Sequence, residues 1–407
     1  MRLSLLSLAL APIALAQSSS SASAASPSAS GASGNSSAYL QQVLGALTQA
    51  NLTGLVSVAS SIANDTAGQA LLAQLAVGNK TVFAPSNDAL SALPQNVTSN
   101  TTLLVETLAY HILNNTYTVN GTKVLPNHTI ARTLLKGDGY SLPGNFSAPV
   151  VLARNSSNAT NFEIVQFDAN ITATGPAMAA NLLVYVVDQV LSLPPSIATL
   201  ATSLFPTLAG VIQQAGLLDP LASAQGITVF APSDAVLSGA QSALGSLNST
   251  QLTDLLANHV INGSVAYSTN IGTGNYTSAA GEPFKFTTNS SGTFVSSANS
   301  TAQIIQSDII IQNGVVHVID GVLLNTASNS TAAAAAYSSG IAAAQTSTEA
   351  TAPVTATSSP AASGSASGSS SSKAAAGQVA PLSWSNGIVG TVLAVAGVVF
   401  GSGYVLM

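Results

Sequence analysis

The chain of 407 residues contains no cysteine. It therefore has no disulfide to stabilise it, no thiol nucleophile and no cysteine ligand for a metal ion. Its stability must come from apolar cores, which domains of about 130–150 residues are large enough to build.

Charged side chains are also scarce. Asp, Glu, Lys and Arg make up 5% of the chain, whereas they make up about 25% of an ordinary soluble domain. The formal net charge is −6, and only eight basic residues are spread over the whole chain. Nucleic acid needs a cluster of Lys and Arg against its phosphates, so we exclude it as a partner. Some other polar group must cover the surface.

Asparagine supplies the missing surface polarity. Of the 28 Asn residues, 19 begin an N-x-Ser/Thr sequon. Such sequons accept N-linked glycans on the surface of secreted proteins, so we predict a heavily N-glycosylated exterior. A surface that is merely rich in Asn, Ser and Thr is the alternative. The candidate glycosylation sites are Asn51, Asn64, Asn96, Asn127, Asn158, Asn248, Asn275 and Asn299.

Both ends of the chain carry targeting signals. Arg2 precedes an apolar stretch and an Ala-Leu-Ala cleavage site, which predicts a signal peptide over residues 1–16. Residues 388–407 carry no charge and are long enough to span a bilayer, but no Lys or Arg follows them. Small residues and a polar spacer precede this tail, so we predict a GPI-attachment signal over 378–407, with Ala375 as the candidate attachment residue. A retained transmembrane helix is the alternative.

Two segments of low complexity flank the central part of the chain. Residues 17–37 form a lead-in of mostly Ser, Ala and Gly, and residues 327–377 are dominated by Ala, Ser, Thr and Gly. Such compositions cannot bury enough apolar surface to offset the entropy lost on ordering. We therefore expect a flexible lead-in and an O-glycosylated stalk that holds the domains away from the membrane.

Between these segments one pattern occurs twice. The string TVFAPSNDAL begins at Thr81 and returns as TVFAPSDAVL at Thr228. Each string is followed by an apolar helix that ends in His, and then by an apolar, β-branched run that ends in Asp. The repetition predicts two homologous domains, over residues 38–194 and 196–326.

The repeated string has the composition of a corner between a strand and a helix. Thr-Val-Phe-Ala favours a short strand, Pro ends its ladder, and Ser is a favourable N-cap. A nucleophile elbow would instead place the Ser between glycines in a G-x-S-x-G pattern, which neither copy has. We therefore predict structural roles for Thr81, Phe83, Pro85 and Ser86, and for Thr228, Phe230, Pro232 and Ser233.

Three of the four histidines are expected to be structural. His111 and His259 lie on the apolar faces of their helices, where a buried imidazole usually bonds a neighbouring group. His317 lies in an apolar strand run, and the first copy has Tyr185 at the matching position. A catalytic base would not readily be exchanged for Tyr. The fourth histidine, His128, lies inside a sequon and is expected to be exposed.

The sequence contains no constellation that is typical of an enzyme. Asp188 and Asp320 recur at the ends of the two apolar runs, where a turn and a local hydrogen bond are expected. No pair of carboxylates recurs at fixed spacing, and there is neither a Gly-rich phosphate loop nor an H-E-x-x-H motif. We therefore predict no catalytic residue, no metal ion and no cofactor.

These motifs, in the same order twice, resemble the fasciclin-like domain family. The second copy matches the family pattern closely over 227–237, at His259 and over 313–324, whereas the first departs from it in its closing run. The resemblance implies an α+β fold with two tandem domains, each a β-wedge or sandwich packed with several helices. Together with the terminal signals, it is similar to fungal GPI-anchored cell-surface proteins.

The resemblance also implies a function. We expect a glycoprotein at the outer face of the plasma membrane or in the cell wall, where it mediates adhesion. Its partners would be glycans and glycoproteins of the surface or wall, with the membrane reached through a lipid anchor. A vacuolar membrane protein that retains its tail and acts in trafficking or fusion is the alternative. A wall-modifying enzyme is a third and less favoured reading.

One candidate partner-binding site comes from the family alone. In animal fasciclin-like domains, an Asp-Ile pair just upstream of the closing motif is linked to integrin-type adhesion. The pair falls here on Asp308 and Ile309, whereas the first copy has Asn170 and Ile171. If a partner binds here, Asp308 would be a surface carboxylate that meets the partner's metal ion, beside the aliphatic Ile309. A turn residue at the entry to a strand is the commoner role for such an Asp.

Overall fold

The computed structural model describes residues 36–137, 139–140, 142–155 and 158–347. The predicted signal peptide, the predicted GPI-attachment signal and its candidate residue Ala375 lie outside these residues. None of the described helices is long and apolar enough to cross a membrane. The described part contains two consecutive domains of α+β class, which confirms the predicted fold class.

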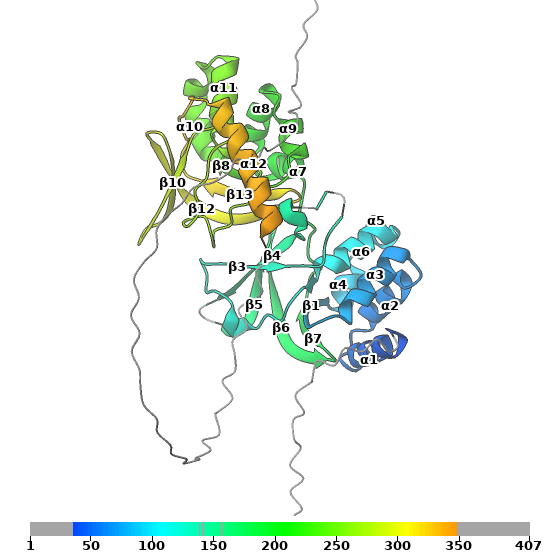
Figure 1. The fold of residues 1–407 in the computed structure, drawn as a ribbon. Coiled ribbons are helices and arrows are strands. Elements are labelled where there is room, and N and C mark those ends of the chain that lie inside the picture. The colour runs from blue at the N-terminus through cyan, green and yellow to red at the C-terminus, as the bar shows by residue number, and fades with distance from the viewer. Residues whose placement is uncertain (1–35, 138, 141, 156–157, 348–407) are drawn as a thin grey trace, which may run out of the picture. The chain divides into compact units, whose positions relative to one another are not determined.

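In the first domain, helices gather on one side of a mixed sheet (Figure 1). The helices are α1 (Ser36–Gln49), α2 (Thr53–Ile62), α3 (Thr66–Leu75), α4 (Asn87–Ser91), α5 (Gln95–Thr98) and α6 (Thr101–Tyr110), with short 3-10 turns η1 (Val119–Gly121) and η2 (Pro143–Asn145). The strands are β1 (Lys80–Pro85), β2 (Ile112–Leu113), β3 (Thr129–Arg132), β4 (Pro149–Asn155), β5 (Asn158–Val165), β6 (Asn170–Ala179) and β7 (Leu182–Val187). Their order is β2-β1-β7-β6-β5-β4-β3, and only β1 and β7 are parallel neighbours among them.

The second domain repeats this plan with a smaller sheet. Its helices are α7 (Ile197–Leu204), α8 (Pro206–Gln214), α9 (Leu218–Ser223), α10 (Asp234–Gly245), α11 (Ser249–Ala257) and α12 (Ser330–Thr346). Its strands are β8 (Ile227–Pro232), β9 (Val260–Asn262), β10 (Phe284–Asn289), β11 (Gly292–Ser297), β12 (Ser300–Ile311) and β13 (Gly314–Ile319). Their order is β10-β11-β12-β13-β8-β9, with β8 and β13 parallel.

The two sheets share a central parallel pair of strands. In the first domain, β1 pairs with β7 so that Phe83 lies opposite Tyr185. In the second domain, β8 pairs with β13 so that Phe230 lies opposite His317. The register thus places Tyr185 and His317 at equivalent positions.

The two phenylalanines of the repeated string are centres of the apolar cores. Phe83 is fully buried and meets the ring of Phe162 edge-on, with 5.7 Å between centroids. Phe230 is equally buried and lies 5.2 Å from the ring of Phe284. Aromatic side chains bury a large area each, so they contribute strongly to domains that lack disulfides.

The threonine that opens the repeated string bridges the strand to a loop. The hydroxyl of Thr81 donates to the carbonyl of Asn115 at 2.9 Å and accepts from the backbone N–H of Tyr117 at 2.8 Å. Thr228 makes the same two bonds, at 3.0 and 2.8 Å, to the loop that follows β9. A hydroxyl can donate and accept at once in little space, which suits Thr to this position in both copies.

In both copies the strand ends at the proline of the string, and a helix begins after the serine that follows. Pro85 and Pro232 are the last residues of β1 and β8. Ser86 caps α4 by accepting from the backbone N–H of Ala89 at 3.2 Å. Ser233 has the extended backbone of an N-cap residue but makes no capping bond with its side chain.

The start of the predicted stalk over 327–377 is helical, which corrects the expectation of an unstructured segment there. Alanine has the highest helix propensity, and Asn329 caps α12 by accepting from the N–H of Ala332 at 3.0 Å. A Cβ atom on Gly340 would lie 2.5 Å from the hydroxyl oxygen of Ser264, so the helix packs closely on the second domain. Gly263 in turn leaves space for the ring of Tyr337, so glycines on both sides permit the close approach. At the other end, α1 already begins at Ser36, within the predicted lead-in.

Candidate functional site

His111 and His259 occupy equivalent buried positions, one residue after the end of α6 and two residues after the end of α11. Nδ1 of His111 lies 2.7 Å from the carbonyl oxygen of Thr107, and its Nε2 accepts from the backbone N–H of Leu191 at 2.9 Å. A carbonyl can only accept, so Nδ1 carries the proton and the ring is neutral. His259 makes the same two bonds at 2.8 and 2.9 Å, to backbone groups of α11 and of the segment after β13.

Burial controls the protonation of these two histidines. Desolvation lowers the pKa of His111 and of His259 to about 4, although the hydrogen bond to a backbone carbonyl opposes this shift in each case. Both ring nitrogens of each residue are used within the fold. Neither imidazole therefore has a nitrogen left for a substrate or a metal ion.

His317 has a comparable position in β13. Its Nε2 lies 2.8 Å from the carbonyl oxygen of Ala266, and its Nδ1 accepts from the backbone N–H of Asp308 at 3.3 Å. The ring is stacked on Phe230 with an interplanar angle of 22°. Burial lowers the pKa of His317, and the negative charge of Asp308 opposes the shift.

Asp308 is not a surface carboxylate, so the expectation of an exposed Asp-Ile pair is wrong. Asp308 is 2% exposed and Ile309 is 3% exposed. The register of β12 against β13 shifts between Gln306 and Ile309, and Asp308 has a positive φ of 63°. A bulge of this kind redirects a side chain. The carboxylate accordingly accepts from the backbone N–H of Ser268 at 2.8 Å and also from its hydroxyl.

His128 of the first domain is the second partner of this carboxylate. Its Nδ1 lies 2.7 Å from Oδ2 of Asp308, and His128 is only 7% exposed, which corrects the expectation of an exposed residue. Burial alone would raise the pKa of Asp308. The hydrogen bond to His128, the field of His317 and the bonds from Ser268 outweigh burial and hold this pKa below its usual value. The carboxylate is therefore ionised at neutral pH and joins the two domains.

A second contact between the domains lies beside this pair. The guanidinium of Arg132 lies between two aromatic rings, 5.2 Å from the centroid of Phe146 and 5.4 Å from that of Tyr267. Val151 of the first domain and Tyr267, Ile310 and Val315 of the second form a small buried cluster. The domains thus meet through apolar packing as well as through one buried polar pair.

The remaining predicted site residues lie at the surface or at strand ends. Asp320 accepts from the backbone N–H of Gln303 at 2.7 Å, and Asp188 is exposed after β7. Seven candidate glycosylation residues are exposed, and the side chain of Asn158 lies outside the described residues. The exposed residues are Asn51, Asn64, Asn96, Asn127, Asn248, Asn275 and Asn299. Within the described part of the chain, no group of three or more His, Asp or Glu side chains could hold a metal ion.

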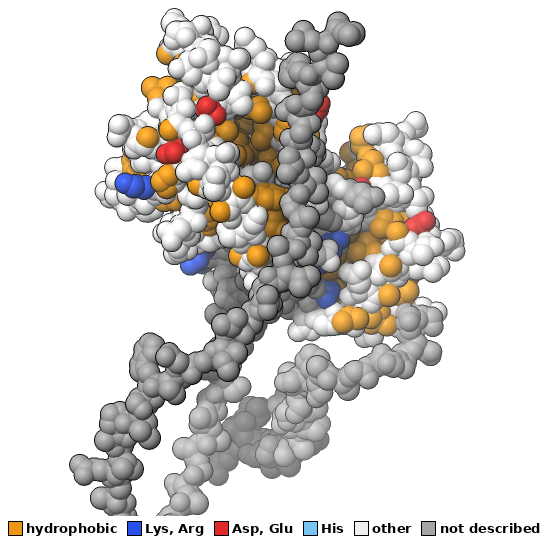
Figure 2. All heavy atoms as spheres, turned by 45° about the horizontal axis from the view of Figure 1, so that its top comes forward, with side chains coloured by type: hydrophobic (Ala, Val, Ile, Leu, Met, Phe, Trp, Pro, Cys, Tyr) orange, Lys and Arg blue, Asp and Glu red, His pale blue; other side chains and the backbone are white. Residues whose placement is uncertain are grey.

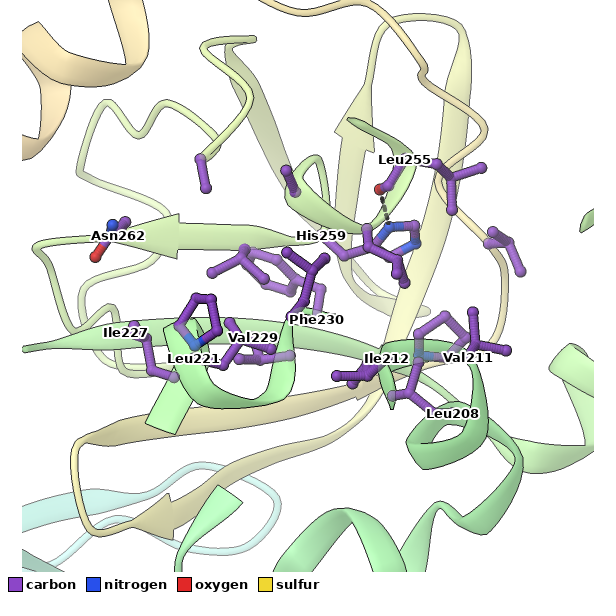
Figure 3. Close-up of a pocket in the computed structure, with 18 of the residues that line it drawn as sticks. Leu208, Val211, Ile212, Leu221, Ile227, Val229, Phe230, Leu255, His259 and Asn262 are labelled. Carbon is purple, nitrogen blue, oxygen red and sulfur yellow. Dashed lines mark hydrogen bonds between the residues drawn. The ribbon is translucent and has the colours of Figure 1, made fainter. Parts of the chain in front are cut away.

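Each domain contains an apolar cavity between its helices and its sheet. The cavity of the second domain has a volume of about 150 Å³, and Figure 3 shows side chains of α8 and β8 around it together with His259. The cavity at the equivalent place in the first domain has a volume of about 60 Å³ and is lined in part by His111. We call these the second-domain cavity and the first-domain cavity. Nothing in the sequence pattern indicated that they differ.

Both copies of the repeated pattern match one family model. The model of the fasciclin domain matches residues 54–194 and 203–325, which together are more than half of the chain. A fasciclin-like arabinogalactan protein of Arthroderma benhamiae is 23% identical over 227 residues, which cover 55% of this chain and 52% of the relative. The fasciclin-like arabinogalactan protein CTB11 of Cercospora beticola is 25% identical over 281 residues, covering 64% of this chain and 72% of that protein. The chain thus spans about half the length of the first relative.

A solved structure is also similar to this chain. It is the domain pair of the insect cell adhesion molecule Fasciclin I, with 17% identity and a TM-score of 0.33, covering 67% of this chain and 98% of that one. At this identity and score, the similarity adds no argument about function.

The core histidines should make the protein sensitive to acid. Below pH 6.5 the unfolded chain binds protons at His111 and His259, whereas the folded chain does not until about pH 4. Stability should therefore fall as the pH drops from about 6.5 to about 4, by on the order of 3 kcal/mol for each imidazole. Denaturant unfolding measured at several pH values checks this.

His259→Ala should lower the free energy of unfolding by about 1–3 kcal/mol at pH 7, and it should make the loss of stability at acidic pH less steep. An equally steep fall in this variant would contradict the assignment.

The buried carboxylate should contribute to stability, unlike a surface one. Asp308→Asn removes the charge that His128 contacts, and we expect it to destabilise the protein by about 1–3 kcal/mol at pH 7. The exposed Asp188→Asn is the matched control, with an expected change within about 0.5 kcal/mol. A double-mutant cycle with His128→Ala should show a coupling of at least about 0.5 kcal/mol. Additive effects would mean that the pair contributes nothing to the folded state.

Proposed function

Because the chain belongs to the fasciclin domain family, we propose that it is a glycosylated cell-surface protein that mediates adhesion to the wall or extracellular matrix. The family supports a role in cell adhesion or at the cell surface, and two relatives are named fasciclin-like arabinogalactan proteins. We further propose that its partners are surface or wall glycans and glycoproteins. This part of the proposal rests on the chemistry of the exposed surface.

The observation that carries the proposal is the distribution of the sequons. All seven candidate asparagines whose side chains are described lie at exposed positions, and they occur in both domains. Charged side chains are sparse on the face seen in Figure 2, where uncharged groups predominate. N-linked glycans at these positions would supply most of the polar surface. A partner would then meet sugars before it meets the polypeptide.

The interior of the domains favours a surface function over catalysis. The histidines that recur, His111 and His259, use both ring nitrogens within the fold. The ionised carboxylate of Asp308 is hydrogen-bonded to His128 and Ser268 rather than presented to solvent. The polar groups that a catalytic centre would need are thus already committed to stabilising the domains.

We also propose that the protein is held at the surface by a GPI anchor attached near Ala375, with residues 378–407 removed. The support is the uncharged tail over 388–407, which a polar spacer and small residues precede. A vacuolar membrane protein with a retained tail is the alternative.

Anchorage can be tested by releasing the protein from intact cells. Phosphatidylinositol-specific phospholipase C, or wall glucanase if the anchor has been transferred to the wall, should release it, and mass spectrometry should find no peptide from 388–407. A variant truncated after residue 377 is the control and should be secreted into the medium. If the mature protein carries the tail peptide, the anchor is wrong and the vacuolar alternative is favoured.

Adhesion through glycans can be tested with sequon variants in the full chain. The variants are Asn96→Gln, Asn275→Gln and Asn299→Gln, and the matched controls Thr98→Ser, Thr277→Ser and Thr301→Ser keep each sequon intact. Each Asn→Gln change should lower the apparent mass and reduce adhesion of expressing cells, while thermal stability changes little because the sites are exposed. If the mass does not change, the sequons are unused. If the mass falls but adhesion persists, the polypeptide rather than the glycans binds the partner.

A further inference from the structure

The second-domain cavity lies between helices α8 to α11 and strand β8. Leu208, Val211 and Ile212 of α8 line one side, and Ile227, Val229 and Phe230 of β8 line another. In Figure 3 these side chains surround one space, with His259 above them. The wall is therefore built by the elements of the repeated fold itself.

The wall of this cavity is apolar and uncharged. Apart from His259 and Asn262, its lining consists of aliphatic, proline and phenylalanine side chains. His259 uses Nδ1 and Nε2 in backbone hydrogen bonds, so it presents mainly its carbon edge. Asn262 lies at the periphery of the group in Figure 3. An ion inside such a wall would lose its hydration without compensation, so a charged ligand is excluded.

The size of the cavity points to a particular ligand. Protein interiors are normally close-packed, with few voids larger than one water molecule. An apolar cavity of about 150 Å³ lined by Leu, Ile and Phe stays dry in another protein and binds benzene or xenon. The second-domain cavity has the same volume, about 150 Å³, and the same kind of lining. We propose that it is a binding site for a neutral apolar molecule about the size of one aromatic ring.

The first domain shows that the fold does not require this space. Its equivalent cavity has a volume of only about 60 Å³. Helix α3 has ten residues and contributes Leu71, Leu72 and Leu75 to that lining, whereas the corresponding α9 has six residues. Side chains of α1 also line the first-domain cavity, but no residue of α7 lines the second-domain cavity. Because α9 is shorter than α3, the second domain keeps a space that side chains of α3 occupy in the first domain.

The correspondence between α3 and α9 rests on hydrogen bonds. Asn181 donates to the carbonyl oxygen of Leu75 at 2.8 Å, and Asn313 donates to that of Leu221 at 2.8 Å. Leu221 is therefore the counterpart of Leu75. Leu75 is buried, whereas Leu221 is only half-buried and lies on the cavity wall. A small outward movement of α9 would admit a ligand at this point.

The site can be tested with benzene as the probe and the full secreted chain as the protein. Benzene at about 100 times its Kd should multiply the folding equilibrium constant of the second domain about 100-fold. Calorimetric unfolding should show this as a saturable rise in the midpoint of one transition. Benzoate, which has the same ring and a negative charge, should give no rise.

A pair of matched variants locates the site. Leu221→Phe should fill the second-domain cavity and abolish the effect of benzene. Leu75→Phe, at the equivalent position of the first domain, should leave that effect intact. Because either variant could unfold, crystals of the unaltered protein under xenon pressure give an independent measurement. A xenon peak should appear in the second-domain cavity and not in the first-domain cavity.

Several results would overturn the proposal. Without a benzene-induced rise and without a xenon peak, the cavity is closed to ligands. A rise of equal size with benzoate would indicate non-specific association. Retention of the benzene effect in a folded Leu221→Phe protein would place the site elsewhere. None of these outcomes depends on anchorage or adhesion, so the proposal stands or falls separately from the proposed function.

Discussion

Each domain depends on one histidine that connects three segments distant in the chain. Its Nδ1 bonds the last turn of its own helix, and its backbone carbonyl accepts from the phenylalanine of the repeated strand. Its Nε2 accepts from a backbone N–H that follows the closing strand. A neutral imidazole suits this position because it offers one donor and one acceptor on opposite edges. The three partners are Thr107, Phe83 and Leu191 for His111, and Leu255, Phe230 and Leu323 for His259.

This connection gives the repeated motifs a structural role. Parallel strands cannot be joined by a tight turn, so the central pair brings together the beginning and the end of each domain. The Thr hydroxyls and the histidines hold the segments that flank this pair. Residues under such constraint are not available for a partner. Functional differences between the copies are therefore expected where the copies diverge, as in the two cavities and at Asp308.

Asp308 illustrates how position in the fold changes the role of a residue. The equivalent register shift of β6 against β7 places Pro176, not Asn170, at the position of Asp308 in the first copy. Pro176 is exposed, whereas Asp308 is buried by a bulge and by the contact with the first domain. A buried carboxylate is costly to desolvate, and removing one of its hydrogen-bond partners leaves it poorly compensated. The hydrogen bond with His128 thus connects β12 to the first domain. Because it is buried, the carboxylate of Asp308 is unavailable for adhesion.

Much of the fold followed from local patterns in the sequence. The repeated string predicted the strand and its turn, the apolar periodicity placed His111 and His259 inside, and the recurrence of both gave two α+β domains. The low complexity of the segment after residue 327 predicts disorder, whereas Ser330–Thr346 form a helix. Two effects favour the helix in this segment. Alanine has a high helix propensity, and Gly340 permits a close approach to the second domain.

By itself, the sequence determined the two-domain plan, the scarcity of charge and the positions open to glycans, because these depend on composition and on short-range periodicity. Only the tertiary structure decided that His128 meets Asp308 and that the second domain contains the larger cavity. Both features arise from contacts between residues far apart in the chain. A contact between two domains and a shorter helix give no periodic pattern in the sequence. Both depend on how elements that can be predicted one by one pack against each other.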